Sequence, residues 1–189
     1  MTSIPAKKRS HLHEASGSSH AQVWQDHIEQ KFVHKDLDGT MRTMADDPEV
    51  IHVPVGMGGR GRAEVRRFFA EFCIGRGPRD ARWTPLSRTV DAERLVDEML
   101  FGFTHDAEIP WMLPGVAPTG KRVEIPLVVV ATFRNGRVES EHVYWDQASV
   151  LAQIGLLARH DLPVLDAVQR QGLVDRTRPL NELAASPRR

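Results

Sequence analysis

The chain contains a single cysteine, Cys73, among its 189 residues. An internal disulfide is thereby excluded, and we expect a reducing compartment, most simply the cytoplasm. The 25 basic and 25 acidic residues cancel, so no excess charge favours nucleic acid or a membrane surface as a partner. The longest apolar run, residues 127–131, is far too short to cross a bilayer. Net neutrality leaves little charge repulsion against self-association, which favours an oligomer.

The residue pattern predicts one folded domain, over residues 20–165, between two tails. Residues 1–19 are polar, rich in serine and aperiodic, which is typical of a flexible N-terminal arm. We expect residues 166–189 to form a similar C-terminal tail.

Within the domain, hydrophobic periodicity predicts helices first and extended strands afterwards. The helices are expected at residues 21–34, 37–45, 62–72 and 148–158. The strands are expected at residues 50–55, 83–90, 95–106, 123–133 and 138–145. Asn135-Gly136 predicts a hairpin turn between the last two strands. This order favours an α+β fold, in which a curved antiparallel sheet wraps around three to four helices and leaves a cone-shaped cavity for a small-molecule ligand.

The last predicted strand ends in EHVYWD, where four groups can carry protons. Because alternate side chains of a strand share a face, His142, Tyr144 and Asp146 should point one way and Glu141 and Trp145 the other. A base, a phenol and a carboxylate in one row suit the lining of a pocket that transfers protons. Asp146 also stands just before a predicted helix, where a structural N-cap is the alternative role.

A second cluster lies on the preceding strand and the loop that follows it. Phe101, Phe103 and His105 share a strand face, and a hydrogen-bonded structural role is the alternative for His105. Trp111 and Met112 stand on a loop rich in proline and glycine, which is typical of a lid or plug over a cavity. A dimer contact is the rival explanation for that loop.

Other stretches give weaker signals. We include His52, on the first strand, and Trp24, on the first helix, in the candidate ligand pocket. The glycines of GMGGRG, residues 56–61, match neither a Walker loop nor a dinucleotide fingerprint and predict a simple chain reversal. Cys73 follows the apolar stripe of its helix and is not a candidate nucleophile.

A metal site would require residues that stand far apart in the sequence. Three imidazoles, on His52, His105 and His142, together with Asp146 would suit zinc or iron. No pair among them has the short spacing of a known metal motif, so we expect no metal and no other cofactor.

The motif E-H-x-x-x-D-x-x-x-x-L-x-Q-x-G resembles the SnoaL-like branch of the nuclear transport factor two-like superfamily. Its residues in this chain are Glu141, His142, Asp146, Leu151, Gln153 and Gly155. The stretches FTHDAEIPWMLPGVAPTG and EHVYWDQASVLAQIGLL look like uncharacterised members associated with dienelactone-hydrolase-like proteins. The resemblance covers about residues 20–165.

This resemblance implies a cone-shaped α+β barrel, usually a homodimer, with a cavity inside the curved sheet. Relatives include polyketide cyclases and ketosteroid isomerases as well as members that only bind partners. In the cyclases an aspartate matching Asp146 is the acid–base residue, which implies that Asp146 faces the cavity together with Tyr144 and His142. Tyr144-Trp145 and the apolar loop depart from the cyclase pattern, so the cyclase substrate is not carried over.

We therefore expect a cofactor-independent lyase, isomerase or cyclase that acts on a small, largely apolar carbonyl or lactone compound. Asp146 would remove a proton next to the carbonyl, and Tyr144, His142 or His105 would stabilise the enolate oxygen. The expected hydrophobic wall or lid consists of Phe101, Phe103, Trp111 and Met112. A non-catalytic ligand-binding or dimeric interaction module is the first alternative, and a hydrolase with a carboxylate-activated water is the second.

Overall fold

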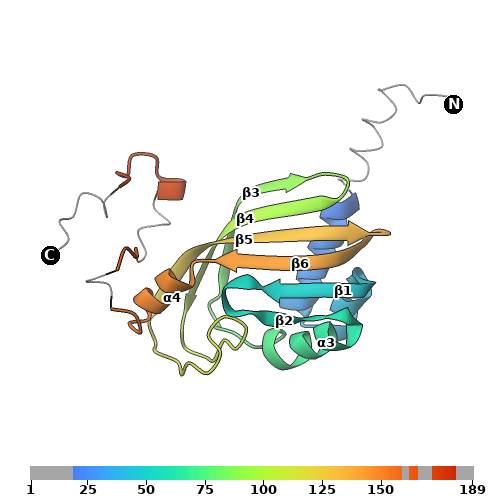
Figure 1. The fold of residues 1–189 in the computed structure, drawn as a ribbon, viewed down its shortest axis with the longest axis horizontal. Coiled ribbons are helices and arrows are strands. Elements are labelled where there is room, and N and C mark those ends of the chain that lie inside the picture. The colour runs from blue at the N-terminus through green and yellow to red at the C-terminus, as the bar shows by residue number, and fades with distance from the viewer. Residues whose placement is uncertain (1–18, 159–161, 166–171, 182–189) are drawn as a thin grey trace.

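The structure is a computed structural model that describes residues 19–158, 162–165 and 172–181. Its centre is one six-stranded sheet with the order β2-β1-β6-β5-β4-β3 (Figure 1). The strands are β1 (Met44–His52), β2 (Met57–Arg60), β3 (Arg82–Val90), β4 (Arg94–Thr104), β5 (Arg122–Arg134) and β6 (Arg137–Trp145). All neighbouring strands run antiparallel except β1 and β6, which are parallel. The predicted α+β class with a curved sheet is confirmed.

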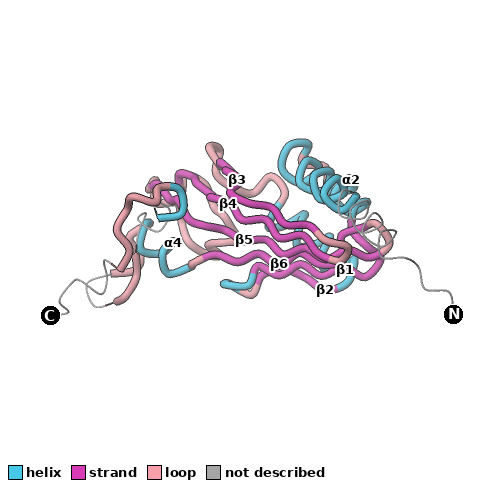
Figure 2. The backbone as a smooth tube through the Cα atoms, turned by 90° about the horizontal axis from the view of Figure 1, so that it is seen from above, coloured by secondary structure: helices cyan, strands magenta, loops and turns pink. Residues whose placement is uncertain are grey.

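The helices of residues 19–158 pack around this sheet, and α2 lies over one of its faces (Figure 2). The first helix covers residues 19–28 and continues as a π-helical turn. The elements are η1 (Glu29–His34), α2 (Leu37–Thr43), a 3₁₀ turn η2 (Val53–Val55), α3 (Gly61–Phe68), a π-helical turn η3 (Phe69–Cys73) and α4 (Gln147–Gln153). Trp24 and Lys31 lie on the buried stripe of the first helix, at i and i+7, whereas Phe32 is 37% exposed.

The core lies between the helices and the inner face of the sheet. In β5 every second side chain is buried, as the period of two in a strand requires. These inner residues are Val123, Ile125, Leu127, Val129 and Ala131. Trp111, Met112 and Leu113, from the loop between β4 and β5, are buried at one end of the same core. The loop therefore packs as a plug, one of the roles expected for it.

Several predicted boundaries were wrong. β1 begins at Met44 instead of residue 50, and it includes Pro48 with a register shift relative to β6. The chain does reverse after β1, but Met57–Arg60 also forms the edge strand β2. The last helix ends at Gln153, because Gly155 takes a left-handed φ of 80°. Residues 1–18, 166–171 and 182–189 of the predicted tails lie outside the described residues.

The β1–β2 hairpin depends on glycine at position 58. Gly58 has φ of +150°, and a Cβ there would lie 1.9 Å from the carbonyl oxygen of Val50. Any side chain would therefore meet the backbone of β1, which a rotamer change does not relieve.

We expect Gly58→Ala to lower the free energy of unfolding by about 1–3 kcal/mol, because it adds backbone strain and a clash with β1. Gly77→Ala is the matched control, since a Cβ at Gly77 meets nothing within 4 Å. Urea denaturation followed by tryptophan fluorescence measures both. Equal midpoints for the two variants would contradict the role given to Gly58.

Candidate functional site

A cavity of about 620 Å³ lies between the first helix and the inner face of the sheet. Its aromatic lining consists of Trp24, Phe32, Trp83 and Trp111. Its charged or titratable lining consists of Lys31, His52, Cys73, Arg88, Asp97, Glu98 and Glu141. The exposed lining residues come from the first helix and β3, for example Val33 and Ser87. The mouth therefore lies between these two elements, and the buried charges lie deeper.

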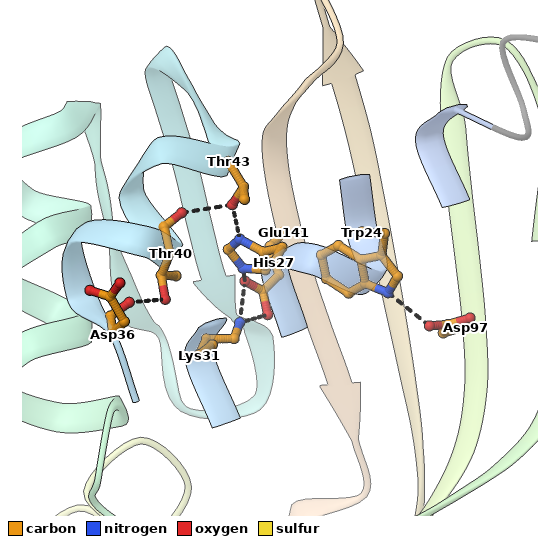
Figure 3. A network of polar contacts seen from close by, with 8 residues as sticks. All are labelled: Trp24, His27, Lys31, Asp36, Thr40, Thr43, Asp97 and Glu141. Atoms are coloured by element: carbon orange, nitrogen blue, oxygen red, sulfur yellow. Dashed lines mark hydrogen bonds and ion pairs between the residues drawn. The ribbon is translucent and has the colours of Figure 1, made fainter. Parts of the chain in front are cut away.

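The inner end of the cavity holds a buried ion pair. Lys31 Nζ donates to both carboxylate oxygens of Glu141, at 2.6 and 2.7 Å. The Lys31 and Glu141 side chains are 2% and 5% exposed, and both point toward the same spot from η1 and β6 (Figure 3). Burial alone would raise the pKa of Glu141, but the positive charge of Lys31 holds it well below its usual range.

Lys31 also lies near two aromatic rings. Its Nζ lies 5.1 Å from the ring centroid of Phe69 and 5.2 Å from that of Phe32. Cation–π attraction adds to the pairing with Glu141 and helps to keep the ammonium at this depth.

His27 lies directly behind this pair and is fully buried. Its Nδ1 lies 2.7 Å from Thr43 Oγ1, and its Nε2 lies 3.4 Å from Glu141 Oε2. Burial and the charge of Lys31 lower the pKa of His27 from its ordinary value.

His52 is a neutral hydrogen-bonding group in the cavity wall. Its Nδ1 donates to the carbonyl oxygen of Trp111 at 3.1 Å, because a carbonyl can only accept. Burial lowers the pKa of His52 to about 4. At neutral pH its Nε2 therefore carries a lone pair and can accept a hydrogen bond.

Nearer the mouth, Asp97 links the first helix to the sheet. Its carboxylate accepts from Trp24 Nε1 at 2.8 Å and from Arg88 at 2.5 and 2.7 Å. This bidentate guanidinium pair neutralises a carboxylate that is otherwise buried among aromatic rings. Asp97 thus positions the Trp24 indole in the cavity wall.

The orientation predicted for the EHVYWD row was wrong. Glu141, Val143 and Trp145 are buried, and Glu141 and Val143 line the cavity. The cavity lining includes neither His142 nor Tyr144, and Tyr144 is 41% exposed. The physical reason is strand pairing: Val143 lies beside Val129, and Trp145 beside Leu127, on the apolar inner face of β5.

The other members of the row have contacts away from the cavity. His142 Nε2 lies 2.9 Å from Glu49 Oε1. Asp146 accepts the Ser149 backbone N–H at 3.0 Å as the N-cap of α4, so the alternative role as a cap is confirmed. Asp146 is also absent from the cavity lining.

Of the second cluster, only part reaches the cavity. His105 is buried, lies outside the lining, and faces Thr119 at 3.2 Å. Phe101, Phe103 and Met112 are buried in the core without lining the cavity. Trp24, His52 and Trp111 do line it, as expected for the pocket.

Sequence reasoning missed His27 and Lys31 and assigned Glu141 to the wrong face. A signal was present, because Trp24, His27 and Lys31 stand at i, i+3 and i+7 of one helix. A histidine and a lysine on the stripe of a buried tryptophan require polar partners. Glu141 supplies one, since it alternates with the apolar Val143 and Trp145.

Neither a metal site nor a membrane-spanning helix is found among the residues that the structure describes. Within residues 19–158, 162–165 and 172–181, no group of three or more His, Cys, Asp or Glu side chains is arranged to hold a metal ion. No helix in these residues is long and apolar enough to cross a membrane.

We expect Lys31→Met to lower the free energy of unfolding by about 3–5 kcal/mol, because it leaves the Glu141 carboxylate buried without its countercharge. The double variant Lys31→Met/Glu141→Gln should regain most of this loss, since neither charge is then left unpaired. Chemical denaturation of the single and double variants, analysed as a double-mutant cycle, measures the coupling. Additive effects would contradict a coupled buried pair.

Comparisons with known proteins agree with this architecture. No match was found among curated proteins. A putative SnoaL-like polyketide cyclase from Jannaschia sp. CCS1 is 19% identical, with a TM-score of 0.61 over 75% of this chain and 95% of that one. AclR, a putative hydroxylase from Streptomyces galilaeus, is 17% identical, with a TM-score of 0.56 over 90% and 99%.

TerC, crystallised with polyporic acid, is 17% identical, with a TM-score of 0.52 over 72% of this chain and 98% of that one. At these identities the likenesses concern the fold. The model of the SnoaL-like domain matches residues 24–141, a segment that carries His27, Lys31 and Glu141 together. The chain belongs to the SnoaL-like domain family.

Proposed function

We propose that the chain is a cofactor-independent enzyme of the lyase, isomerase or cyclase type. It acts by acid–base chemistry on a small, largely apolar carbonyl or lactone compound in the cavity. One observation carries the proposal: a buried lysine–glutamate pair lines the inner end of an otherwise mostly apolar cavity. Proton transfer is thereby assigned to Glu141 and Lys31, which replace the outer row of Asp146, Tyr144 and His142.

The proposed step conserves charge within the cavity. The Glu141 carboxylate removes a proton from the carbon next to the carbonyl, and the electron pair of the broken C–H bond moves onto the carbonyl oxygen. The negative charge thus leaves Glu141 and appears on the ligand oxygen. Lys31 remains positive and can donate to that oxygen, so the ammonium stabilises the enolate as it stabilised the carboxylate.

The cavity walls support a ligand that is flat and largely apolar. Trp24, Trp83 and Trp111 line the cavity, and aromatic rings favour stacked or edge contacts with an unsaturated ligand. The neutral His52 can accept a hydrogen bond from a hydroxyl group of the ligand.

Relatives with this fold bind small organic molecules. TerC was crystallised with polyporic acid, and a ketosteroid-isomerase-like protein from Catenulispora acidiphila with trimethylamine. These ligands are compatible with a small-molecule cavity here. A non-catalytic binding module and a hydrolase both use the same cavity, so they become outcomes of the experiment.

We expect the protein to exchange the hydrogen next to the carbonyl in at least one compound of a panel of small aryl ketones and lactones. The compounds are incubated in D₂O, and exchange is followed by proton NMR. The Lys31→Met/Glu141→Gln variant should lower the exchange rate by about 10²-fold or more, because the general base is lost. Binding is measured separately by quenching of tryptophan fluorescence.

Tyr144→Phe is the control, since this side chain lies on the outer face. It should keep the wild-type exchange rate. Binding without exchange would favour the binding module, and opening of a lactone in the same spectra would favour the hydrolase. Loss of exchange in Tyr144→Phe, together with normal exchange in the double variant, would contradict the role of Glu141 and Lys31. It would favour proton transfer by the outer row of Asp146, Tyr144 and His142.

We also propose that the chain forms a homodimer through the outer face of the sheet. Apolar side chains on this face include the half-buried Val96 beside Val130 and the half-buried Val128 beside the exposed Tyr144. Exposed apolar surface is typical of a protein–protein interface. The absence of net charge on the chain leaves little repulsion between two copies.

Val128→Lys should therefore convert a dimer to a monomer, because it places a charge in the buried centre of the interface. Light scattering after size-exclusion chromatography measures the mass. Gln22→Lys, at an exposed position of the first helix, lies on the other side of the sheet and should leave the dimer intact. A wild-type mass equal to that of one chain would refute the proposal.

A further inference from the structure

The tautomer of His27 follows from two neighbours in α2, Thr40 and Thr43. Thr43 Oγ1 donates its only proton to the carbonyl oxygen of Thr40, at 2.7 Å. The same oxygen lies 2.7 Å from His27 Nδ1, and it can only accept there. His27 Nδ1 must therefore carry the proton, and in the neutral ring Nε2 carries a lone pair.

This lone pair faces another acceptor. His27 Nε2 is buried and makes no hydrogen bond with any described residue, although Glu141 Oε2 lies only 3.4 Å away. A buried polar atom without a partner costs roughly 1–3 kcal/mol. One additional proton on Nε2 would turn this contact into a charge-assisted hydrogen bond to the Glu141 carboxylate.

We propose that His27 stores the proton that Glu141 takes from the ligand. The O–H bond on Glu141 breaks as the N–H bond on His27 Nε2 forms, so Glu141 returns to a carboxylate and His27 becomes an imidazolium. The cavity then holds a ligand anion, such as an enolate or phenolate, beside Lys31. This inference rests on the proposed function and explains how a carboxylate that is itself a weak base can hold a ligand in its deprotonated form.

The other titratable groups near the pair do not compete for this proton. Burial raises the pKa of Cys73 to about 12 and lowers that of His52 to about 4, so both remain neutral near pH 7. Burial and Lys31 also lower the pKa of His27. In the empty cavity His27 is therefore neutral and ready to accept. Once Lys31 pairs with a ligand anion, Glu141 has lost part of its countercharge, and a proton on His27 restores it.

A chromophoric phenol tests the relay without turnover. We use 4-nitrophenol, whose phenolate absorbs in the visible range, at saturating concentration over a pH series. In the wild type the proton moves internally from the probe to His27. The bound phenolate fraction should therefore stay constant with pH over a plateau that extends below the pKa of the free probe.

Two variants remove the store in different ways. His27→Asn keeps a side-chain N–H that can donate to Thr43, but it has no nitrogen that titrates. Thr43→Val keeps the imidazole but removes the hydroxyl that fixes the proton on Nδ1. In His27→Asn the proton of the probe can move only to Glu141, which is a weak base, so the plateau should disappear. Bound phenolate should then fall about tenfold for each pH unit below the pKa of the bound probe. Thr43→Val should lower the plateau. Thr132→Val, which removes a hydroxyl bonded to Ser140 at the outer face, is the matched control with the wild-type plateau.

The outcomes separate the two proposals. A wild-type plateau that persists in His27→Asn overturns the storage role and leaves the proposed function standing. Binding of the probe only as the neutral phenol in the wild type contradicts the stabilisation of an oxyanion by Lys31, and with it the proposed function. Thermal unfolding of each variant shows that it is folded before the absorbance is compared. If His27→Asn does not fold, the plateau in Thr43→Val decides: an unchanged plateau overturns the storage role.

Discussion

The site depends on one constraint: the ammonium of Lys31 and the carboxylate of Glu141 are buried at the same point and must neutralise each other. Replacing such a pair by packed apolar side chains is often neutral or stabilising, so stability alone does not explain its presence. The pair lies at the inner end of a cavity and not in the closed core. Contact with a ligand is a role for the two charges that packing in a closed core does not provide.

The same pair fixes how the first helix meets the sheet. Lys31 and His27 lie on the helix stripe that begins with Trp24, and Asp97 holds Trp24 in the cavity wall. A rotation of this helix would separate Lys31 from Glu141 and leave both charges unpaired. The π-helical turn at Glu29–His34 belongs to this arrangement, and such turns occur frequently at functional sites. Specific polar contacts, rather than apolar area alone, therefore set the orientation of the helix.

The sequence was sufficient for the fold class, because strand alternation, helix stripes and the Asn135-Gly136 turn are local signals. It was insufficient for the face of β6 that points inward. Glu141, Val143 and Trp145 alternate with His142, Tyr144 and Asp146, and both sets contain polar and apolar or aromatic members. Only the pairing of Val143 with Val129 decides between them, and a partner strand is not visible in the local pattern. The site was missed for the same reason, since Lys31 and Glu141 stand 110 positions apart in the chain.

The distribution of bonds over the two faces of β6 gives a chemical reason to place proton transfer inside. On the outer face, His142 is paired with Glu49, and Asp146 caps α4, so both groups already have structural roles. On the inner face, His27 Nε2 is a buried acceptor with no hydrogen bond among the described residues. A buried polar atom without a partner calls for an explanation, and a catalytic role is one of them. The proposed protonation of His27 beside Glu141 supplies such an explanation, with the bound ligand as the source of the proton.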